Sequence, residues 1–387
     1  MLTHTTAALL VSIASLLAPA DPDAALHERV DSRRLMDTLQ ALPTKRSPGP
    51  TAEHIEGLRA TETLIAERLR TLGYEPVLHE VPYALPGRRE PAVYHNVIAE
   101  VRGTTKPAEV ILVGAHLDAV PLAPGADDNG TGAAGLLELA HIFKDHKPER
   151  TIRFAFFTLE EAGLVGSTKY AADLRDRLLG GDGERIVGML SLDMLGYYSD
   201  DPGSQTWPPL PVRIPLPTTA NFLAVGGLLK HQGFSRPLIT AMQQGAGDAL
   251  VIFAGDLLPL PVPDFLRSDH APFLQMGIPS VLVSDTANFR SSHYHRPTDT
   301  IETIDPVRFA AAVRALAAGI AHVADLPAFD PPALPEPEQP RPAPKPRPRP
   351  ASPNNPPQPD PHSPVAPRPA DPANPGPAPG QGPERPR

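Results

Sequence analysis

The sequence predicts an α/β fold, a three-layer α/β/α sandwich with a central mixed sheet that is mostly parallel. Segments with helical periodicity alternate with apolar segments of strand length along the chain, and several strand segments are apolar from end to end. Such strands are buried on both faces, as in a mostly parallel sheet that helices cover on both sides. Residues 25–327 contain no repeat and no linker, so we expect one domain there.

The first half of this domain contains two predicted helices before any strand. In the second helix Leu58, Ile65 and Leu69 fall on one face, and Gly73 ends it. Two strands follow, and the polar turn at 103–106 predicts that they pair with each other. The predicted elements are helices at 31–42 and 51–72, strands at 93–102 and 109–114, a helix at 133–146 and a strand at 153–158.

The second half continues the alternation around one irregular segment. Residues 197–217 are rich in proline, which lacks the backbone N–H that helices and sheets need, so we expect a loop. The last helix has Asp305 as its cap and Pro306 at its first position. The predicted elements are a helix at 167–179, a strand at 186–192, a helix around 221–231, a short strand around 238–241, a helix at 268–276, a strand at 280–284 and a helix at 306–323.

Composition excludes some classes of partner and of metal ligand. Apolar residues make up 41% of the 387 residues, which is enough for a large core. The formal net charge is -9, so there is no basic surface of the kind that binds nucleic acid. Cysteine is absent, which excludes disulfides and thiolate ligands. Any bound metal must therefore be held by histidines and carboxylates.

The N-terminus predicts export. Residues 7–17 form an apolar run too short to anchor the chain in a bilayer, and the small-x-small pattern at 18–20 resembles a signal cleavage site. We expect a signal peptide over residues 1–20 and a secreted, periplasmic or cell-envelope protein with no stable membrane anchor. No later segment is expected to be long and apolar enough to span a membrane. No Lys or Arg precedes the run, so a helix packed on the domain is the alternative.

The C-terminal residues 328–387 predict a disordered tail. Residues 331–387 contain 24 prolines in 57 positions, and few apolar side chains that could form a core. The tail is interpreted either as a solvated segment, or as a spacer or a ligand for a proline-binding module. Its partner is unknown.

Three predicted strands end in acidic or histidine side chains. One is followed by His116 and Asp118, the next by Glu160 and Glu161, and a third by Asp193. Open α/β sheets place their sites at the carboxyl ends of strands. A single ending of this kind could be a helix cap or a surface turn. Three of them, together with a tight acidic turn and a late histidine-rich loop, predict a site.

The charges predict that this site binds cations. If the strand ends converge, Asp128, Glu161 and Asp193 come close together, with Glu160 adjacent. Crowded carboxylates either raise their pKa values or bind cations, and two divalent ions would balance this cluster better than one. Histidine and carboxylate ligands without thiolate suit zinc, with cobalt or manganese as substitutes.

Six motifs occur in an order that resembles the co-catalytic (two-zinc) aminopeptidase family. This family includes the bacterial leucyl aminopeptidases and relatives of glutamate carboxypeptidase II, transferrin receptor and glutaminyl cyclase. The resemblance covers about residues 46–320 and leaves out both ends of the chain. The motifs are AHLDAV, GADDNGTG, TLEEAGLVGS, SLDMLGY, SDHAPFLQMGIPSVLV and HYHRPTDT.

The resemblance implies the metal ligands. His116 and Asp193 would hold one zinc ion, Glu161 and His295 would hold the other, and Asp128 would bridge the two.

The same resemblance excludes Asp127 and His293 from the metal ligands. Asp128 matches the bridging residue because it directly precedes Asn129, which leaves Asp127 as a turn or capping residue. His295 is favoured because it precedes Arg-Pro-Thr-Asp-Thr, which leaves His293 as a solvated loop residue. The family also implies a cis peptide bond after Asp128.

Four further residues receive roles by resemblance. Glu160 resembles the general base, which would take a proton from a zinc-activated water and pass it to the leaving amine. Asp118 would accept the second ring proton of His116. Tyr294 matches a tyrosine that hydrogen-bonds the tetrahedral intermediate, or else it simply packs. Asp269 resembles a residue that lies just behind the metal ligands.

Together these residues predict an exported zinc aminopeptidase, with residues 21–327 as the catalytic domain and peptides with a free N-terminus as substrates. The specificity pocket is expected to involve residues 197–217 and 253–265. One alternative is a single-zinc glutaminyl cyclase, although those enzymes usually have Trp where this chain has Tyr294. Another is an inactive binding module like transferrin receptor, which is disfavoured because every ligand position is filled.

Overall fold

A computed structural model of the protein describes residues 25–84, 91–181, 183–209 and 215–325. These residues all belong to one unit, which extends from residue 1 to residue 336. The predicted signal peptide, residues 1–20, and the whole of the predicted tail, residues 328–387, lie outside the described residues. Both therefore stay predictions.

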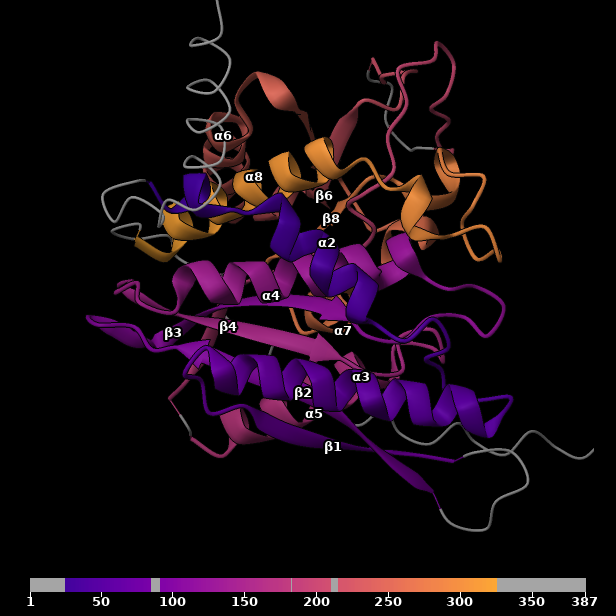
Figure 1. Ribbon diagram of the computed structural model, residues 1–387. Coiled ribbons are helices and arrows are strands. Elements are labelled where there is room, and N and C mark those ends of the chain that lie inside the picture. Colours follow the sequence, from indigo (N-terminus) through magenta and orange to yellow (C-terminus); the bar gives the residue numbers. More distant parts are fainter. Residues whose placement is uncertain (1–24, 85–90, 182, 210–214, 326–387) are drawn as a thin grey trace, which may run out of the picture. The chain divides into compact units, whose positions relative to one another are not determined.

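The centre of the fold is an eight-stranded mixed sheet with the strand order β1-β2-β4-β3-β5-β8-β6-β7 (Figure 1). Strands β4, β3, β5 and β8 run parallel, as do β6 and β7, whereas β1, β2 and the β6–β8 contact are antiparallel. The predicted mixed sheet is confirmed. The strands are β1 (Val77–Tyr83), β2 (Ala92–Val101), β3 (Lys106–His116), β4 (Arg150–Phe157), β5 (Arg185–Leu192), β6 (Phe222–Leu228), β7 (Val251–Leu258) and β8 (Ser280–Ser284).

Helices cover both faces of this sheet (Figure 1). Successive residues of a strand point to opposite faces, and in β3 Ile111 and Val113 join one apolar core while Val110 and Leu112 join another. The larger core includes side chains of α2, α3, α4, α6 and α8, and the smaller includes those of α5 and α7. The three-layer prediction is therefore confirmed. The helices are α2 (Ser32–Ala41), α3 (Ala52–Thr71), α4 (Gly132–Phe143), α5 (Val165–Leu179), α6 (Gln232–Ala246), α7 (His270–Gln275) and α8 (Pro306–Asp325).

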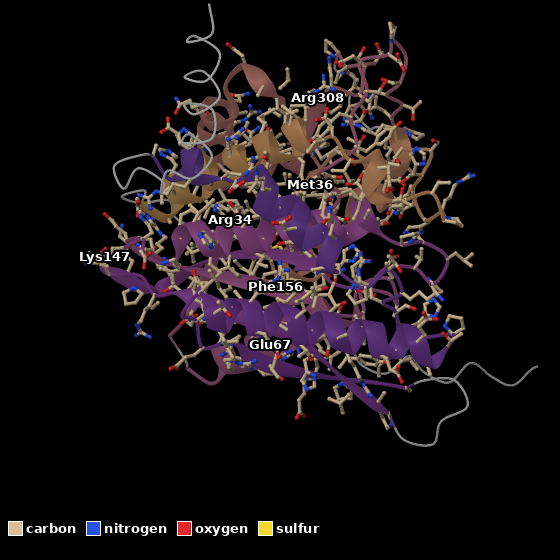
Figure 2. All side chains as sticks on the ribbon, viewed as in Figure 1. Arg34, Met36, Glu67, Lys147, Phe156 and Arg308 are labelled. Carbon is tan, nitrogen blue, oxygen red and sulfur yellow. The ribbon has the colours of Figure 1, made fainter. Side chains whose placement is uncertain are left out.

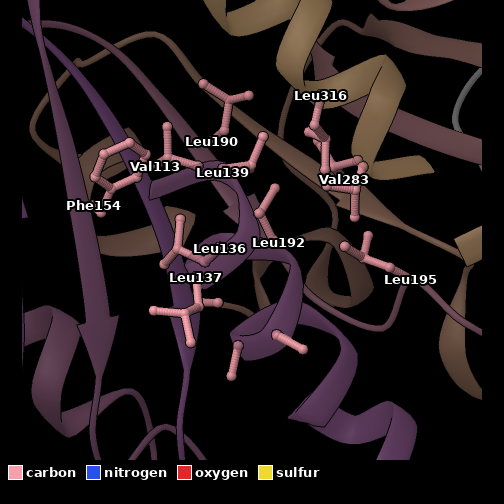
Figure 3. Close-up of a cluster of buried hydrophobic side chains, with 14 of the residues drawn as sticks. Val113, Leu136, Leu137, Leu139, Phe154, Leu190, Leu192, Leu195, Val283 and Leu316 are labelled. Carbon is pink, nitrogen blue, oxygen red and sulfur yellow. The ribbon is translucent and has the colours of Figure 1, made fainter. Parts of the chain in front are cut away.

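The larger core fills the space between α4, α8 and the middle of the sheet. Figure 3 shows Leu136 of α4, Val113 and Leu190 of the sheet, and Leu316 of α8 as members of this core. The contrast between the inside and outside of a layer is seen in Figure 2, where Phe156 of β4 is fully buried and Glu67 of α3 is exposed.

Aspartates cap the starts of two helices, and the cap predicted at Asp305 is confirmed. Asp31 accepts a hydrogen bond from the backbone N–H of Arg33 at the start of α2. Asp305 accepts from the N–H groups of Val307 and Arg308 at the start of α8. These contacts satisfy backbone donors that have no partner inside the helix.

Helix α8 differs from expectation in one respect. Its length and mean hydropathy of 1.4 fit a membrane span, although we expected no such segment. However, 67% of its apolar window is buried inside the fold. The apolar composition of α8 is thus that of a core helix packed against α6 and the sheet.

Three predictions about the elements are wrong. The strands β2 and β3 do not pair with each other, because β4 lies between them in the sheet. The segment 221–231, expected to be a helix, contains strand β6, and the segment 238–241, expected to be a strand, lies inside helix α6. The edge strands β1 and β7 were not predicted.

Candidate metal centre

The five predicted ligands come together at the carboxyl edge of the parallel strands. His116 is the last residue of β3, Asp193 directly follows β5, and Glu161 follows β4 after a short turn. Asp128 lies in the irregular turn that leads into α4, and His295 lies in the loop after β8. Because β4, β3 and β5 are parallel neighbours, their ends lie at one edge of the sheet.

The carboxylate of Asp128 faces two groups of side chains. Its Oδ1 lies 3.3 Å from Nε2 of His116, which in turn is 3.5 Å from Oδ1 of Asp193. Its Oδ2 lies 3.0 Å from Nε2 of His295, which is 3.2 Å from Oε1 of Glu161. One carboxylate thus stands between a histidine–carboxylate pair on each side, as a bridging ligand requires.

These spacings fit a pair of zinc ions. Ligand atoms at zinc bond lengths in a tetrahedral arrangement are about 3.3 Å apart. Oδ2 of Asp128 and Oε1 of Glu161 are buried and both face Nε2 of His295, as three ligands of one cation would. Among the described residues, Glu160 also shares a group of converging ligand atoms with His116 and Asp193. Its Oε2 lies 3.9 Å from Nε2 of His116.

The electrostatics of the cluster also favour cations. Burial raises the pKa of Glu160 well above its ordinary value, although the charge of His116 opposes the shift. Burial and the charge of Asp128 raise the pKa of Glu161 to about 7. Burial would lower the pKa of His295, but hydrogen bonds to Asp128 and Glu161 raise it to about 10. Each shift reflects carboxylates that lack sufficient positive charge, which divalent cations provide.

Asp118 connects the strand that ends in His116 to the turn that carries the two glutamates. Nδ1 of His116 lies 3.1 Å from the carbonyl oxygen of Asp118 and 3.7 Å from its carboxylate, so the carbonyl is the nearer partner. The carboxylate accepts hydrogen bonds from the backbone N–H groups of Glu160 and Glu161, at 2.9 and 3.1 Å. Leu159, just before them, has a left-handed backbone with φ of 60°. Asp118 therefore stabilises the strained turn that presents Glu160 and Glu161.

The predicted cis peptide bond between Asp128 and Asn129 is present. Asp127 accepts hydrogen bonds from Thr131 and from the backbone N–H of Gly196, so it orders the turn. His293, which was expected to be a solvated loop residue, contacts the hydroxyl of Thr298 through Nδ1.

Asp269 is fully buried at the start of α7. Burial raises its pKa to about 7, and the charges of His116 and Asp193 act on it. These charges place Asp269 near the cluster, and its role there stays a prediction.

Tyr294 lies beside the cluster and is held on two sides. Its ring stacks on the imidazole of His295 with 3.8 Å between centroids. Its hydroxyl oxygen accepts a hydrogen bond of 2.6 Å from Nη2 of Arg267. Since the oxygen accepts from Arg267, the hydroxyl proton is free to be donated elsewhere.

A cavity of about 560 Å³ opens onto the cluster. Its walls are mainly apolar and include Trp207, Phe253 and Phe265, which come from the two segments expected to form a specificity pocket. Ala224 of β6 and Gly255 of β7 also line the cavity, and the small size of these two residues leaves space in it. The indole of Trp207 stacks on Phe222 with ring centroids 5.8 Å apart.

Sequence reasoning missed two buried residues that hold the turn before α4. Asp299 lies inside the quoted motif HYHRPTDT, but no role was given to it. Arg46 lies between the predicted helices at 31–42 and 51–72, and its buried side chain has no signal in the local pattern.

The comparison with known proteins begins with sequence families. The family described as Peptidase family M28 matches residues 96–320. The Escherichia coli (strain K12) protein named "Uncharacterized protein YfbL" is 29% identical over 68% of this chain and 80% of its own length. The "Probable lipoprotein aminopeptidase LpqL" of Mycobacterium tuberculosis is 32% identical over 61% of this chain. The match spans 46% of LpqL, less than half of its length.

Solved structures with the same fold are found at low sequence identity. A zinc aminopeptidase from Bacillus subtilis, BSAP, has a TM-score of 0.58 at 18% identity, covering 77% of this chain and 96% of that one. A glutaminyl cyclase from Fimbriiglobus ruber has a TM-score of 0.56 at 21% identity, covering 79% and 99%. At these identities the likeness shows the fold alone.

Proposed function

Because this chain belongs to peptidase family M28, we propose that it is a zinc-dependent aminopeptidase, which removes N-terminal residues from peptides. The observation that carries the proposal is the position of Asp128 between two histidine–carboxylate pairs, at 3.3 and 3.0 Å from the two histidines. That arrangement provides five ligands for two cations and leaves Glu160 for another role.

In this proposal His116 and Asp193 hold one zinc ion, Glu161 and His295 hold the other, and Asp128 bridges them. When bound, the two ions polarise the carbonyl of the scissile peptide bond and make a water more acidic. Cobalt or manganese could replace zinc, because the donor set contains no thiolate.

Glu160 acts as the general base. Glu160 is 8% exposed and lines the cavity, so little bulk water reaches its carboxylate to exchange protons with it. It takes a proton from the attacking water and then protonates the amine that leaves, which returns the carboxylate to its starting state. The hydroxyl of Tyr294 donates its free proton to the oxyanion that forms on the former carbonyl.

Cleavage at the N-terminus is supported by the aminopeptidase names of LpqL and BSAP. A mainly apolar cavity beside the cluster suits a large apolar side chain on the first residue of a peptide. The substrates in this proposal are peptides with a free N-terminus and such a first residue. The proposal includes export through the signal peptide at residues 1–20.

Glutaminyl cyclase activity is a second candidate, since an enzyme of that class shares the fold. That reaction needs only one zinc ion, whereas this chain offers five ligands in two groups around Asp128. A metal-to-protein ratio near two would therefore favour the peptidase.

The test combines metal analysis with a panel of aminoacyl-nitroanilides. We expect about two zinc ions per chain, release of nitroaniline fastest from leucyl or phenylalanyl substrates, loss of activity with chelator, and recovery on adding zinc. Glutaminyl peptides are the control for cyclisation. Metal-loaded protein that hydrolyses none of the panel would refute the aminopeptidase proposal.

A further inference from the structure

Arg46 ties together the two ends of the loop that separates His116 from Asp128. Its side chain is 2% exposed and makes hydrogen bonds only with backbone carbonyls. Nε donates to Leu117 at 2.9 Å, next to His116. Nη1 donates to Pro124 at 2.5 Å, and Nη2 donates to Gly125, close to the turn that carries Asp128. A single guanidinium thus sets the distance between the start and the end of this loop.

The packing around this guanidinium leaves little freedom. Gly125 has a left-handed backbone with φ of 68°, and a Cβ there would lie 2.8 Å from Nη2 of Arg46 and 2.5 Å from the carbonyl oxygen of Asp128. The carbonyl of Arg46 accepts a hydrogen bond of 2.9 Å from the N–H of Ala119, in the same loop.

Asp299 holds the other side of the same turn. Its side chain is 1% exposed, and its two carboxylate oxygens accept hydrogen bonds from the N–H groups of Asp127 and Asp128, at 2.8 and 3.1 Å. Its carbonyl accepts from Ala126 at 3.3 Å. Three consecutive backbone donors therefore end on a residue that lies four positions after His295, which joins the loop of His295 to Asp128.

The charges of the two residues are complementary. Arg46 is always protonated, and the negative charges that act on it include Asp299, Asp118 and Asp128. A buried guanidinium needs such charges nearby, because it has left bulk water. Neither Arg46 nor Asp299 lines the cavity or belongs to the two groups of proposed ligands. Their effect on the metal centre is therefore indirect.

We propose that Arg46 and Asp299 are positioning residues that hold Asp128 between His116 and His295 at the spacing a metal pair requires. The inference rests on the metal centre of the proposed function. It predicts that their loss weakens zinc binding in addition to any loss of folding stability.

The experiment uses the full chain and measures zinc affinity by competition with a chelating dye, together with the melting temperature with and without zinc. The variants are Asp299→Asn, Arg46→Met and Arg46→Lys. In Asp299→Asn the amide nitrogen faces a backbone N–H, so one hydrogen bond is lost with almost no change in size. Arg153→Met is the matched control, because Arg153 is also buried and paired but lies on β4 with Glu100 and Glu184.

We expect zinc affinity to fall by about 10–100-fold in Asp299→Asn and Arg46→Met, the range seen for partners of metal ligands. Arg46→Lys should lie between Arg46→Met and wild type, since an ammonium keeps the charge but reaches fewer carbonyls. The rise in melting temperature that zinc produces should shrink in these variants. Arg153→Met should lower the melting temperature equally with and without zinc and leave zinc affinity unchanged.

If Asp299→Asn and Arg46→Lys bind zinc as tightly as wild type, the positioning role is wrong, whatever their melting temperatures. These two variants decide the matter even if Arg46→Met does not fold. Wild-type protein that binds no zinc would overturn the proposed function together with this inference. Wild type and variants that bind two ions equally well would overturn the inference alone.

Discussion

At the scale of single residues, the chemistry of the proposed centre depends on which carboxylates are ligands and which one stays free. Glu160 and Glu161 are neighbours in the chain, yet Glu161 faces His295 at 3.2 Å while Glu160 lies 3.9 Å from His116. The turn held by Asp118 sends the two side chains to different sides of the cluster. Adjacent glutamates can therefore take different roles.

The proposed role of Glu160 predicts a separation of metal binding from turnover. Glu160→Gln keeps the shape of the side chain but cannot accept a proton, so kcat should fall by roughly 10²-fold or more. Metal analysis should still find the zinc content of wild type. Glu138→Gln, at a buried glutamate paired with Arg34 away from the site, is the control and should keep kcat. Normal turnover by Glu160→Gln would rule out this base.

The sequence predicted the ligand positions better than the residues that hold them. His116, Asp193 and Glu161 follow apolar strands, and a sharp change from apolar to acidic residues is visible in one dimension. The contacts of Arg46 with backbone carbonyls depend on no particular partner side chain, so no pattern near residue 46 indicates them. Asp118 was assigned to His116, but its contacts with the glutamate turn arise only when β3 and β4 lie side by side.

At the scale of the elements, the strands β6 and β7 extend the sheet and form part of the cavity wall. Their small residues give the cavity its depth, since Ala224 and Gly255 both line it. Strand β6 was not predicted from the sequence, because Gly226 and Gly227 weaken its strand pattern. Helix α6 contains Pro237 in its first turns, which favours a helix end in a local interpretation. Packing of α6 on α8 outweighs that local preference.

Filling this cavity from β6 should change substrate preference. In Ala224→Leu the added side chain would occupy space that a large first residue of the substrate needs. We expect kcat/KM for phenylalanyl-nitroanilide to fall by about 10–100-fold relative to that for alanyl-nitroanilide, which corresponds to a few methylene groups of apolar contact. The ratio of the two substrates measured on one preparation corrects for any partial loss of folded protein. An unchanged ratio would show that the first residue binds elsewhere.

The alternation of helices and strands was sufficient to predict the layers, but not the order of the strands. The expected pairing of β2 with β3 fails because β4, which comes later in the chain, is inserted between them. Local sequence contains no information on such an insertion. Edge strand β1 contains Pro82, which an edge tolerates because, among the described residues, one side of its backbone pairs with no strand.

At the scale of the whole molecule, the buried Arg153 joins strand β4 to strand β2 and to the segment before β5 through ion pairs. Arg153 of β4 makes two hydrogen bonds with Glu184, at 2.8 and 2.7 Å, and a third and fourth with Glu100. Burial alone would raise the pKa of Glu184, but hydrogen bonds and the charge of Arg153 lower it below its ordinary value. The folded state therefore favours the ionised form of Glu184.

The ion pair between Arg153 and Glu184 predicts how the free energy of unfolding depends on pH. A carboxyl with a lowered pKa in the folded state stabilises the fold above its unfolded pKa of about 4.3, and that contribution is lost as pH falls. Glu184→Gln should reduce the free energy of unfolding by about 1–2 kcal/mol at pH 7, with a smaller effect near pH 3. Urea unfolding in the presence of chelator measures both values. Glu67→Gln, at an exposed position, should change neither by more than about 0.5 kcal/mol.

The contact between Asp299 and the Asp128 turn has a consequence for synthesis of the protein. His295 and Asp299 precede only the last helix of the domain, so a ribosome must translate nearly the whole fold before these residues emerge. A nascent chain, or one truncated before this loop, lacks a ligand and the hydrogen bonds that order the turn. In the proposed function, hydrolytic activity would then begin only after translation of the domain is almost complete.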